Sequence, residues 1–252
     1  MGIAEVEPDV FAVATGNFSL LTGATVQGSW SVWSLSFRTG RGKDPVVIKI
    51  AEIPSALFLN GATTLPNSRE TLLISDSTAG TVYNLNFATG AHRIVISDPL
   101  LRANASARPR IGVNGIHYRD KYLYFTNTFQ PPLLARIPVS PIDGSQQGPA
   151  QVIADKPDFP AVALGDDFAL DQAKNAWIAT ASNTLVKVSL DGKQTVIAGG
   201  EDSQVLKGCT SAAFGIGRGQ EKMLYITTSG GLADPALGIE GGGVYSIDTS
   251  KL

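Results

Sequence analysis

Residues 58–66 read Phe-Leu-Asn-Gly-Ala-Thr-Thr-Leu-Pro, and they open a unit that the chain repeats. A polar turn follows, and then come two strand-like stretches, Thr-Leu-Leu-Ile-Ser-Asp-Ser at 71–77 and Gly-Thr-Val-Tyr-Asn-Leu at 80–85. The same plan returns from Asn114 and again from Asp166. Each copy places a small polar residue where its first predicted strand begins, and this repeated residue type is the main functional clue in the sequence.

The rest of the chain also carries strand patterns. Residues 2–15 read as a strand, a Pro-Asp turn and a second strand, and residues 29–37 alternate with a period of two. Residues 46–53 predict a fourth strand. No stretch has helical periodicity over ten or more residues, because glycine or proline interrupts every candidate. The predicted class is all-β.

The spacing of the repeated units predicts the architecture. From Asn60 to Asn114 is 54 residues, from Asn114 to Asp166 is 52, and from Asp166 to Thr210 is 44. Periods of about 40–50 residues with four strands each are typical of β-propellers. We therefore predict a single β-propeller domain over residues 1–252, with five recognisable four-stranded blade units. The first strand of each blade lines the central channel of a propeller, so we expect Asn60, Asn114, Asp166 and Thr210–Ser211 to gather at one mouth of it.

Composition excludes several classes of protein. The 252 residues carry a net charge of −2 without a basic stripe, which argues against a nucleic-acid partner. No apolar run approaches the ~20 residues of a membrane helix, so we expect no membrane partner either. Cys209 is the only cysteine, which excludes an internal disulfide and a thiolate zinc site. The start at Met1 lacks the features of a signal peptide, which predicts a cytoplasmic protein.

Each candidate residue also has a structural interpretation. Asn or Asp at a strand start often forms a turn by bonding its own backbone, but three copies at blade-like spacing favour a shared site. Neighbours on a strand point to opposite faces, so we expect only one of Asp166 and Asp167 to enter the channel. Trp30, Trp33 and Trp177 are predicted to pack between blades.

The repeated blade units resemble the SMP-30/gluconolactonase-like family of six-bladed propellers. The resemblance is closer to the fungal branch of that family, which includes hetero-Diels–Alderases of tropolone–sesquiterpenoid biosynthesis. The resemblance covers nearly the whole chain from Gly2 onward. The segments that carry it are Asn60-Gly, Asn114-Gly-Ile, Asp166-Asp-Phe-Ala-Leu-Asp, Thr210-Ser-Ala-Ala-Phe-Gly and Leu224-Tyr-Ile-Thr-Thr-Ser-Gly-Gly.

The chain departs from that family in its number of blades. We count five units, and the first begins at the innermost strand of a blade, so we expect that the first blade of the six-bladed family is missing. A missing blade would leave an uncovered strand edge, which predicts possible self-association. Relatives in the family can be secreted, in contrast to the cytoplasmic location predicted above.

In the lactonase members of the family, a divalent metal lies at the channel mouth. By position, the resemblance gives Asn114 and Asp166 as metal ligands, Asp166 also as the base, and Asn60 as a residue beside the substrate. The remaining ligand, a Glu, would lie in the missing blade, and Asp167 replaces the family's Gly. One carboxylate and neutral amides suit a hard cation poorly. We therefore predict no metal and no cofactor, with a divalent metal at Asn114 and Asp166 as the alternative.

The function we predict is that of a small-molecule-binding propeller enzyme of fungal secondary metabolism. It would be a metal-independent, hetero-Diels–Alderase-like cyclase that acts on a reactive polyketide or terpenoid intermediate. The predicted catalytic residues are Asn60, Asn114, Asp166 and Ser211, and the predicted substrate-binding residues are Phe58, Asp167 and Thr210. The alternatives are a metal-dependent lactonase and a non-catalytic propeller scaffold.

Overall fold

A computed structural model describes residues 1–252 except 20–21, 41, 67, 156–163, 201 and 233–237. The described residues form five antiparallel β-sheets and contain no α-helix; their two short 3₁₀-helices are η1 (Pro99–Leu101) and η4 (Thr249–Lys251). Within the described part of the chain, no helix is long and apolar enough to cross a bilayer. The prediction of an all-β protein is confirmed.

The strands, in chain order, are β1 (Ile3–Glu7), β2 (Val10–Thr15), β3 (Ser31–Ser36), β4 (Val46–Glu52), β5 (Leu59–Leu65), β6 (Ser68–Asp76), β7 (Thr81–Asn86), β8 (His92–Ile96), β9 (Val113–Arg119), β10 (Tyr122–Asn127), β11 (Leu134–Pro138), β12 (Gln151–Ala154), β13 (Gly165–Leu170), β14 (Ala176–Thr180), β15 (Thr184–Val188), β16 (Gln194–Gly199), β17 (Cys209–Phe214), β18 (Met223–Thr228) and β19 (Val244–Asp248).

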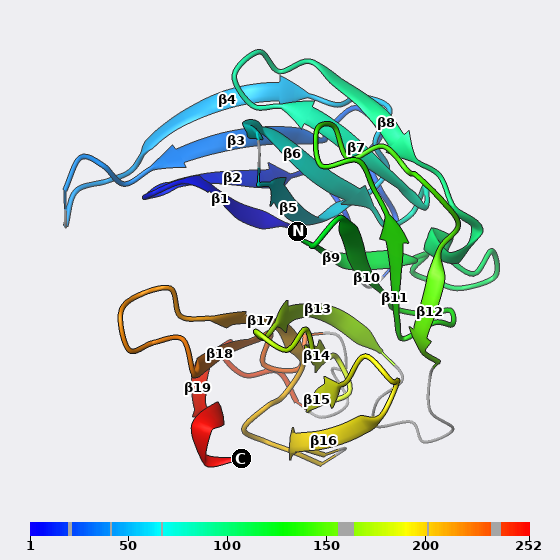
Figure 1. Ribbon diagram of the computed structural model, residues 1–252. Helices are drawn as coiled ribbons and strands as arrows, with labels where there is room; N and C mark the ends of the chain where they lie inside the picture. Colours follow the sequence, from blue (N-terminus) through cyan, green and yellow to red (C-terminus); the bar gives the residue numbers. More distant parts are fainter. Residues whose placement is uncertain (20–21, 41, 67, 156–163, 201, 233–237) are drawn as a thin grey trace. The chain divides into compact units, whose positions relative to one another are not determined.

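Each sheet joins strands that follow one another in the chain (Figure 1). The sheets are β1–β4, β5–β8, β9–β12 and β13–β16, with four strands each, and β17–β19, with three described strands. Short turns suffice to connect such neighbouring antiparallel strands, which is why turn residues recur so regularly in the sequence. These sheets are the blades of a β-propeller fold, and they match the five units that the sequence indicated. We number them blades 1 to 5 in chain order.

The chain divides into two compact units, and each is described by itself. Unit 1 comprises Met1–Phe125 and Arg136–Gln151, and unit 2 comprises Thr126–Ala135 and Val152–Leu252. Unit 1 therefore holds blades 1 and 2 and part of blade 3. Unit 2 holds the rest of blade 3 with blades 4 and 5. The prediction of one domain over residues 1–252 stays a prediction.

Aromatic side chains pack between neighbouring blades in both units. In unit 1, the fully buried Trp30 lies 5.6 Å from the ring of Phe58, measured between ring centroids. In unit 2, Trp177 meets Phe214 edge to face at 6.1 Å. The prediction of inter-blade packing is confirmed for these two tryptophans and stays a prediction for Trp33. The described contacts of Trp33 all lie within blade 1, because its indole N–H points to Thr15 and Ser31 and the Lys49 ammonium covers its ring.

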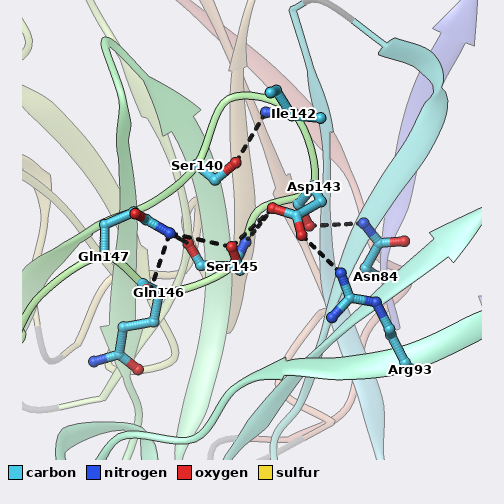
Figure 2. Close-up of polar contacts among 8 residues, drawn as sticks. All are labelled: Asn84, Arg93, Ser140, Ile142, Asp143, Ser145, Gln146 and Gln147. Atoms are coloured by element: carbon cyan, nitrogen blue, oxygen red, sulfur yellow. Dashed lines mark hydrogen bonds and ion pairs between the residues drawn. The ribbon is translucent and has the colours of Figure 1, made fainter.

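A loop of blade 3, residues 140–147, docks on blade 2 within unit 1 (Figure 2). The main-chain carbonyl of Asp143 accepts a hydrogen bond from Asn84 Nδ2 at 2.7 Å, and its carboxylate pairs with Arg93 at 2.7 Å. Gly144 lies so close to Leu73 that an added Cβ would come within 2.5 Å of a Leu73 methyl carbon. The loop thus contacts β6, β7 and β8 of blade 2 through one apolar, one polar and one charged contact.

The Asp143 carboxylate is the electrostatic centre of this loop. Burial alone would raise the pKa of Asp143, but hydrogen bonds from Ser145, from Ser140 and from Arg93 outweigh burial and lower that pKa to about 2. Both the hydroxyl and the main-chain N–H of Ser145 donate to Asp143 Oδ1, at 2.8 and 3.1 Å. The loop is therefore organised around an ionised Asp143.

Candidate functional site

Among the strand pairs whose register is described, those of three blades have a β-bulge at the start of the first strand, where the sequence placed the candidate residues. On β5, the three steps from Leu59 to Ala62 oppose only the two from Asp76 to Ile74. One extra residue enters β13 between Gly165 and Phe168, and one enters β17 between Cys209 and Ser211. Bulges of this kind re-aim side chains and are common beside functional sites.

The bulge in β13 falls at the aspartate pair. Regular alternation would place Asp166 and Asp167 on opposite faces, but the bulge between Gly165 and Phe168 interrupts the register at these two residues. Both side chains are half-buried. Strand periodicity therefore does not decide which of the two faces the site.

The structure brings Asn60 and Asn114 into direct contact in unit 1. Asn60 Nδ2 donates to Asn114 Oδ1 at 2.8 Å and to Ser77 Oγ at 3.1 Å. Asn60 Oδ1 in turn accepts a hydrogen bond from the Met1 nitrogen at 3.1 Å. Only 8% of Asn60 and 4% of Asn114 is exposed, so each amide is fixed largely by protein contacts.

A glycine beside Asn60 allows this contact. An added Cβ on Gly61 would lie 2.4 Å from the main-chain oxygen of Asn114. No other residue type would let the strands β5 and β9 approach so closely without displacing one of them. The Asn-Gly pair that marks the repeat thus has two functions: the asparagine supplies an amide, and the glycine supplies the space.

Hydroxyl groups from the second strand of one blade hold the first strand of the next. Ser75 Oγ donates to the Asn114 carbonyl at 2.8 Å, and Ser77 Oγ donates to the Val113 carbonyl at 2.5 Å. The same arrangement recurs in unit 2, where Thr126 donates to the Asp166 carbonyl at 2.6 Å and Thr128 donates to the Gly165 carbonyl at 3.0 Å. Sequence reasoning missed these four residues, although Ser-Asp-Ser and Thr-Asn-Thr stand at equivalent positions of blades 2 and 3.

Asp76, the middle residue of Ser-Asp-Ser, fixes the segment that leads into β5. Its fully buried carboxylate accepts main-chain N–H groups at 2.8–3.2 Å from Leu57, Phe58, Thr78 and Ala79. Such a concentration of donors on one carboxylate stabilises a defined loop conformation. Sequence reasoning missed Asp76 as well.

Phe58 is placed by these contacts and by ring packing. Its ring stacks on Phe18 at 4.0 Å and lies against Trp30, and only 5% of the residue is exposed. The observed contacts give Phe58 a packing role between blades. Its role in substrate binding stays a prediction.

In unit 2, Asp167 and Ser211 join the first strands of blades 4 and 5. Ser211 Oγ donates to Asp167 Oδ2 at 3.1 Å, and Asp167 Oδ1 accepts the N–H of Phe168 at 2.9 Å. The hydroxyl of Thr210 lies 2.8 Å from that of Thr227. A carboxylate, a serine and a threonine from two blades therefore share this end of the sheets.

Cys209, the residue before Thr210, has the properties of a packing residue. Burial, reinforced by the negative charge of Asp166, raises the pKa of its thiol to about 12. The thiol is fully buried and donates to the Leu206 carbonyl at 3.3 Å. A thiol with so high a pKa is a poor nucleophile at neutral pH.

The candidate residues thus form two groups, one in each unit. Asn60 and Asn114 belong to unit 1, whereas Asp166, Asp167 and Thr210–Ser211 belong to unit 2. Each group is a set of neighbouring strand starts tied by hydrogen bonds. The convergence of both groups on one channel mouth stays a prediction.

The donor set fits a divalent metal poorly. Across the described residues, no three His, Cys, Asp or Glu side chains lie close enough together to hold a metal ion. The oxygen that Asn114 would offer to a cation already accepts a hydrogen bond from Asn60. Hard cations such as Ca²⁺ favour six to eight oxygen ligands, several of them carboxylates. The prediction of a site without a metal stays a prediction, and the residues present do not supply a metal centre.

Two known proteins with similar sequences share one description. A protein of Phoma sp. named "Putative hetero-Diels-Alderase" is 27% identical over 255 aligned residues, which cover 90% of this chain and 68% of that protein. A second, from Sarocladium schorii, has the same description and is 24% identical over 265 aligned residues, covering 90% of this chain and 62% of that protein. The chain is a distant homologue of both. It spans about two thirds of their lengths, and no model of a known protein family matches it.

Solved structures confirm the fold. A calcium-binding regucalcin of Agrobacterium tumefaciens matches with a TM-score of 0.63 at 20% identity, covering 97% of this chain and 74% of the other. The Malassezia sympodialis allergen Mala s 1 matches with a TM-score of 0.65 at 13% identity, covering 99% of this chain and 78% of the other. At such identities the likeness concerns the fold alone. It confirms the predicted structural similarity to SMP-30-type propellers.

Proposed function

We propose that this chain is a cyclase of the hetero-Diels–Alder type, which binds a reactive small molecule beside the strand starts and directs its cycloaddition without a metal. The single observation that supports this most is the distant homology, over 90% of the chain, to two proteins described as hetero-Diels–Alderases. The hydrogen-bonded side chains at the strand starts suit such a reaction, because it needs orientation and a polarised oxygen rather than a nucleophile.

The reaction requires little covalent chemistry from the protein. A four-atom conjugated system that ends in oxygen and a two-atom alkene form one C–C and one C–O bond, three π bonds become one, and no atom is lost. Holding the two partners in a near-attack arrangement supplies much of the rate. A hydrogen bond to the reacting oxygen lowers the barrier further, because negative charge develops there in the transition state.

In this proposal Asn114 is the hydrogen-bond donor in unit 1, and Asn60 positions it. Asn60 Nδ2 donates to both Ser77 and Asn114, so its amide nitrogen is used within the protein. The bond that Asn114 Oδ1 accepts orients the Asn114 amide and polarises its N–H groups. The main chain of Asn114 is fixed by Ser75.

The corresponding group in unit 2 consists of Ser211, Thr210, Asp166 and Asp167. The Ser211 hydroxyl donates to Asp167, and a substrate hydroxyl that reaches Asp167 would replace this bond with one of the same kind. We therefore assign substrate binding to Asp167 and Thr210. Ser211 is the second candidate donor, and Asp166 is retained as a candidate base.

The test is a stereochemical assay. An ortho-quinone methide, generated in situ from a 2-hydroxybenzyl precursor, is mixed with an achiral cyclic sesquiterpene alkene in the presence and absence of the purified protein. The uncatalysed reaction gives a racemic product, whereas the proposed cyclase gives an excess of one enantiomer and a faster reaction. A racemic product formed at the uncatalysed rate would count against the proposal and favour a non-catalytic scaffold.

Three variants test the roles proposed for Asn114 and Asn60. Asn114→Ala is expected to lower the catalysed rate by about tenfold to a hundredfold, because removing one transition-state donor has effects of that size. Asn60→Ala should lower enantiomeric excess as well as rate, since a misplaced donor still donates. Asn86→Ala is the matched control, because Asn86 lies at the end of β7 and bonds the turn at Ala88 and Thr89. If all three variants behave alike, the assigned roles are wrong.

A further inference from the structure

A groove of about 710 Å³ opens in unit 2 between blades 4 and 5. Its walls come from the end of β16, from loop residues 202–206, and from β18 and β19. Pockets that hold small molecules have volumes of roughly 300–1,000 Å³. None of the candidate residues at the strand starts lines this groove, so it is a separate site.

The lining of the groove is mainly apolar and includes one aromatic ring. Ile226 pairs with Tyr245 across β18 and β19, and both side chains therefore lie on the same face of the sheet. Ile226 is fully buried, whereas Tyr245 is 37% exposed and Val205 on the opposite wall is 60% exposed. A buried floor between half-exposed apolar walls favours a ring-shaped apolar ligand.

The loop that forms one wall is held in place at both ends by Asn183. The N–H of Gly200 donates to the Asn183 carbonyl at 3.1 Å, and the N–H of Gly208 donates to Asn183 Oδ1 at 2.7 Å. Gly199 has a φ of 86°, and an added Cβ there would come within 2.0 Å of the Asn183 oxygen. These contacts form the groove without a ligand, which reduces the entropy that binding would cost.

The charge of the groove comes from Asp202. It is the one ionisable group with a formal charge at neutral pH among the lining residues, and it is exposed. In the part of the chain that the structure describes, no basic side chain pairs with its carboxylate. The groove therefore presents exposed apolar walls and a negative rim, which favours a cation over an anion.

We propose that this groove binds an apolar ring compound that carries a protonated amine. The ring lies against Tyr245 and over Ile226, and the ammonium group lies at the Asp202 carboxylate. This inference concerns a site outside the strand starts and does not depend on the proposed cyclase activity.

Three probes that share one ring system test it: 2-naphthylmethylamine, 2-naphthylmethanol and 2-naphthoate, each titrated into the intact protein and followed by fluorescence or NMR. The expected order of affinity is amine, then alcohol, then acid. The amine should bind about threefold more tightly than the alcohol, because an exposed ion pair contributes modestly. Asp202→Asn should abolish this advantage and leave the affinity for the alcohol within about twofold of wild type.

A pair of tyrosine variants locates the binding site. Tyr245→Ala should weaken the binding of the alcohol by about tenfold, since the ring contact is lost. Tyr225→Ala is the matched control: Tyr225 is also 37% exposed and lies on β18, but it pairs with Ser246 and faces the other side of the sheet. Circular dichroism of both variants checks that they fold. The proposal is overturned if no probe shows saturable binding, if the acid binds as tightly as the amine, or if Tyr245→Ala binds like wild type.

Discussion

Two blade junctions of this protein differ on their outer side. Between blades 2 and 3, in unit 1, the 140–147 loop contacts β6, β7 and β8 of blade 2 and anchors there through Asp143 (Figure 2). Between blades 4 and 5, in unit 2, loop residues 202–206 stand beside the sheets and leave a groove of about 710 Å³. Both junctions are built from the same antiparallel blades, so the loops, rather than the strands, decide whether a junction is closed or open.

This difference separates stability from binding. In the closed junction, the half-buried Asp143 and Asn84 and the exposed Arg93 bond one another and hold the loop of blade 3 on blade 2. In the open junction, the exposed side chains of Tyr245 and Val205 and the carboxylate of Asp202 face water, so a ligand can use them. Substitutions of the same residue type should therefore lower the free energy of unfolding strongly in unit 1 and weakly around the groove.

The largest effect is expected at the most buried aspartate of unit 1. Asp76→Ala should lower the free energy of unfolding by about 3–5 kcal/mol, because four main-chain N–H groups would lose a buried charged acceptor. Urea unfolding followed by circular dichroism measures the loss. Asp202→Ala, at the rim of the groove, is the control and should change stability by less than about 0.5 kcal/mol. Equal costs for the two variants would contradict the distinction between a buried carboxylate of unit 1 and the exposed one at the groove.

The tight contact of the closed junction gives the second prediction. Gly144→Ala should cost about 2 kcal/mol, because Gly144 has a φ of 71° and the new methyl group would meet Leu73. Gly219, in unit 2, has a similar φ of 79° but no atom within 4 Å of the added Cβ, so Gly219→Ala should show only the backbone strain, about 1 kcal/mol. Thermal unfolding of both variants separates strain from clash. A cost at Gly144 no larger than that at Gly219 would mean that the loop does not pack on blade 2.

The third prediction concerns pH. The pKa of Asp143 is lowered to about 2 in the folded protein from an ordinary value of 3.8. The stability that its ionised form contributes is therefore present above about pH 4 and is lost as the pH falls toward 2. Asp143→Asn should cost about 1 kcal/mol at pH 7, a modest value because the side chain is 35% exposed. Urea unfolding at several pH values between 2 and 7 should show a shallower acid loss for the variant than for wild type. Parallel curves would refute the assigned role.

The sequence predicted the blades far better than it predicted what lies between them. Strand positions follow from alternation and turn residues, which are local, so the units opening at Asn60, Asn114 and Asp166 could be read directly. The bulge at Asp166 and Asp167 depends on the partner strand, so alternation alone does not decide which of the two side chains faces the site. The expectation that only one of them enters the channel stays a prediction. Asp76 is visible in the sequence within Ser-Asp-Ser, but no local pattern predicts that four main-chain N–H groups donate to its carboxylate.

Loops were the least predictable part for the same physical reason. Residues 140–147 and 202–206 both mix polar and apolar residues, and their sequences do not distinguish a loop that docks from one that stands apart. Docking depends on Asn84, Arg93 and Leu73, which lie some fifty to seventy residues earlier in the chain. The pairing of Asn60 with Asn114 was predictable only because the blade period related the two positions.

The smallest effect is expected at the wall of the groove, and it compares the two junctions with one substitution. Val205 is 60% exposed, so Val205→Thr, which exchanges a methyl group for a hydroxyl of nearly the same size, should change stability by less than about 0.5 kcal/mol. Val139, beside the docked loop in unit 1, is only 2% exposed, and its N–H donates to the Lys121 carbonyl. Val139→Thr should cost about 1–2 kcal/mol, because the new hydroxyl would be buried among apolar groups. Chemical unfolding of the two variants side by side measures the difference. If Val205→Thr costs as much as Val139→Thr, water does not reach the groove wall, and the junction between blades 4 and 5 is closed in solution.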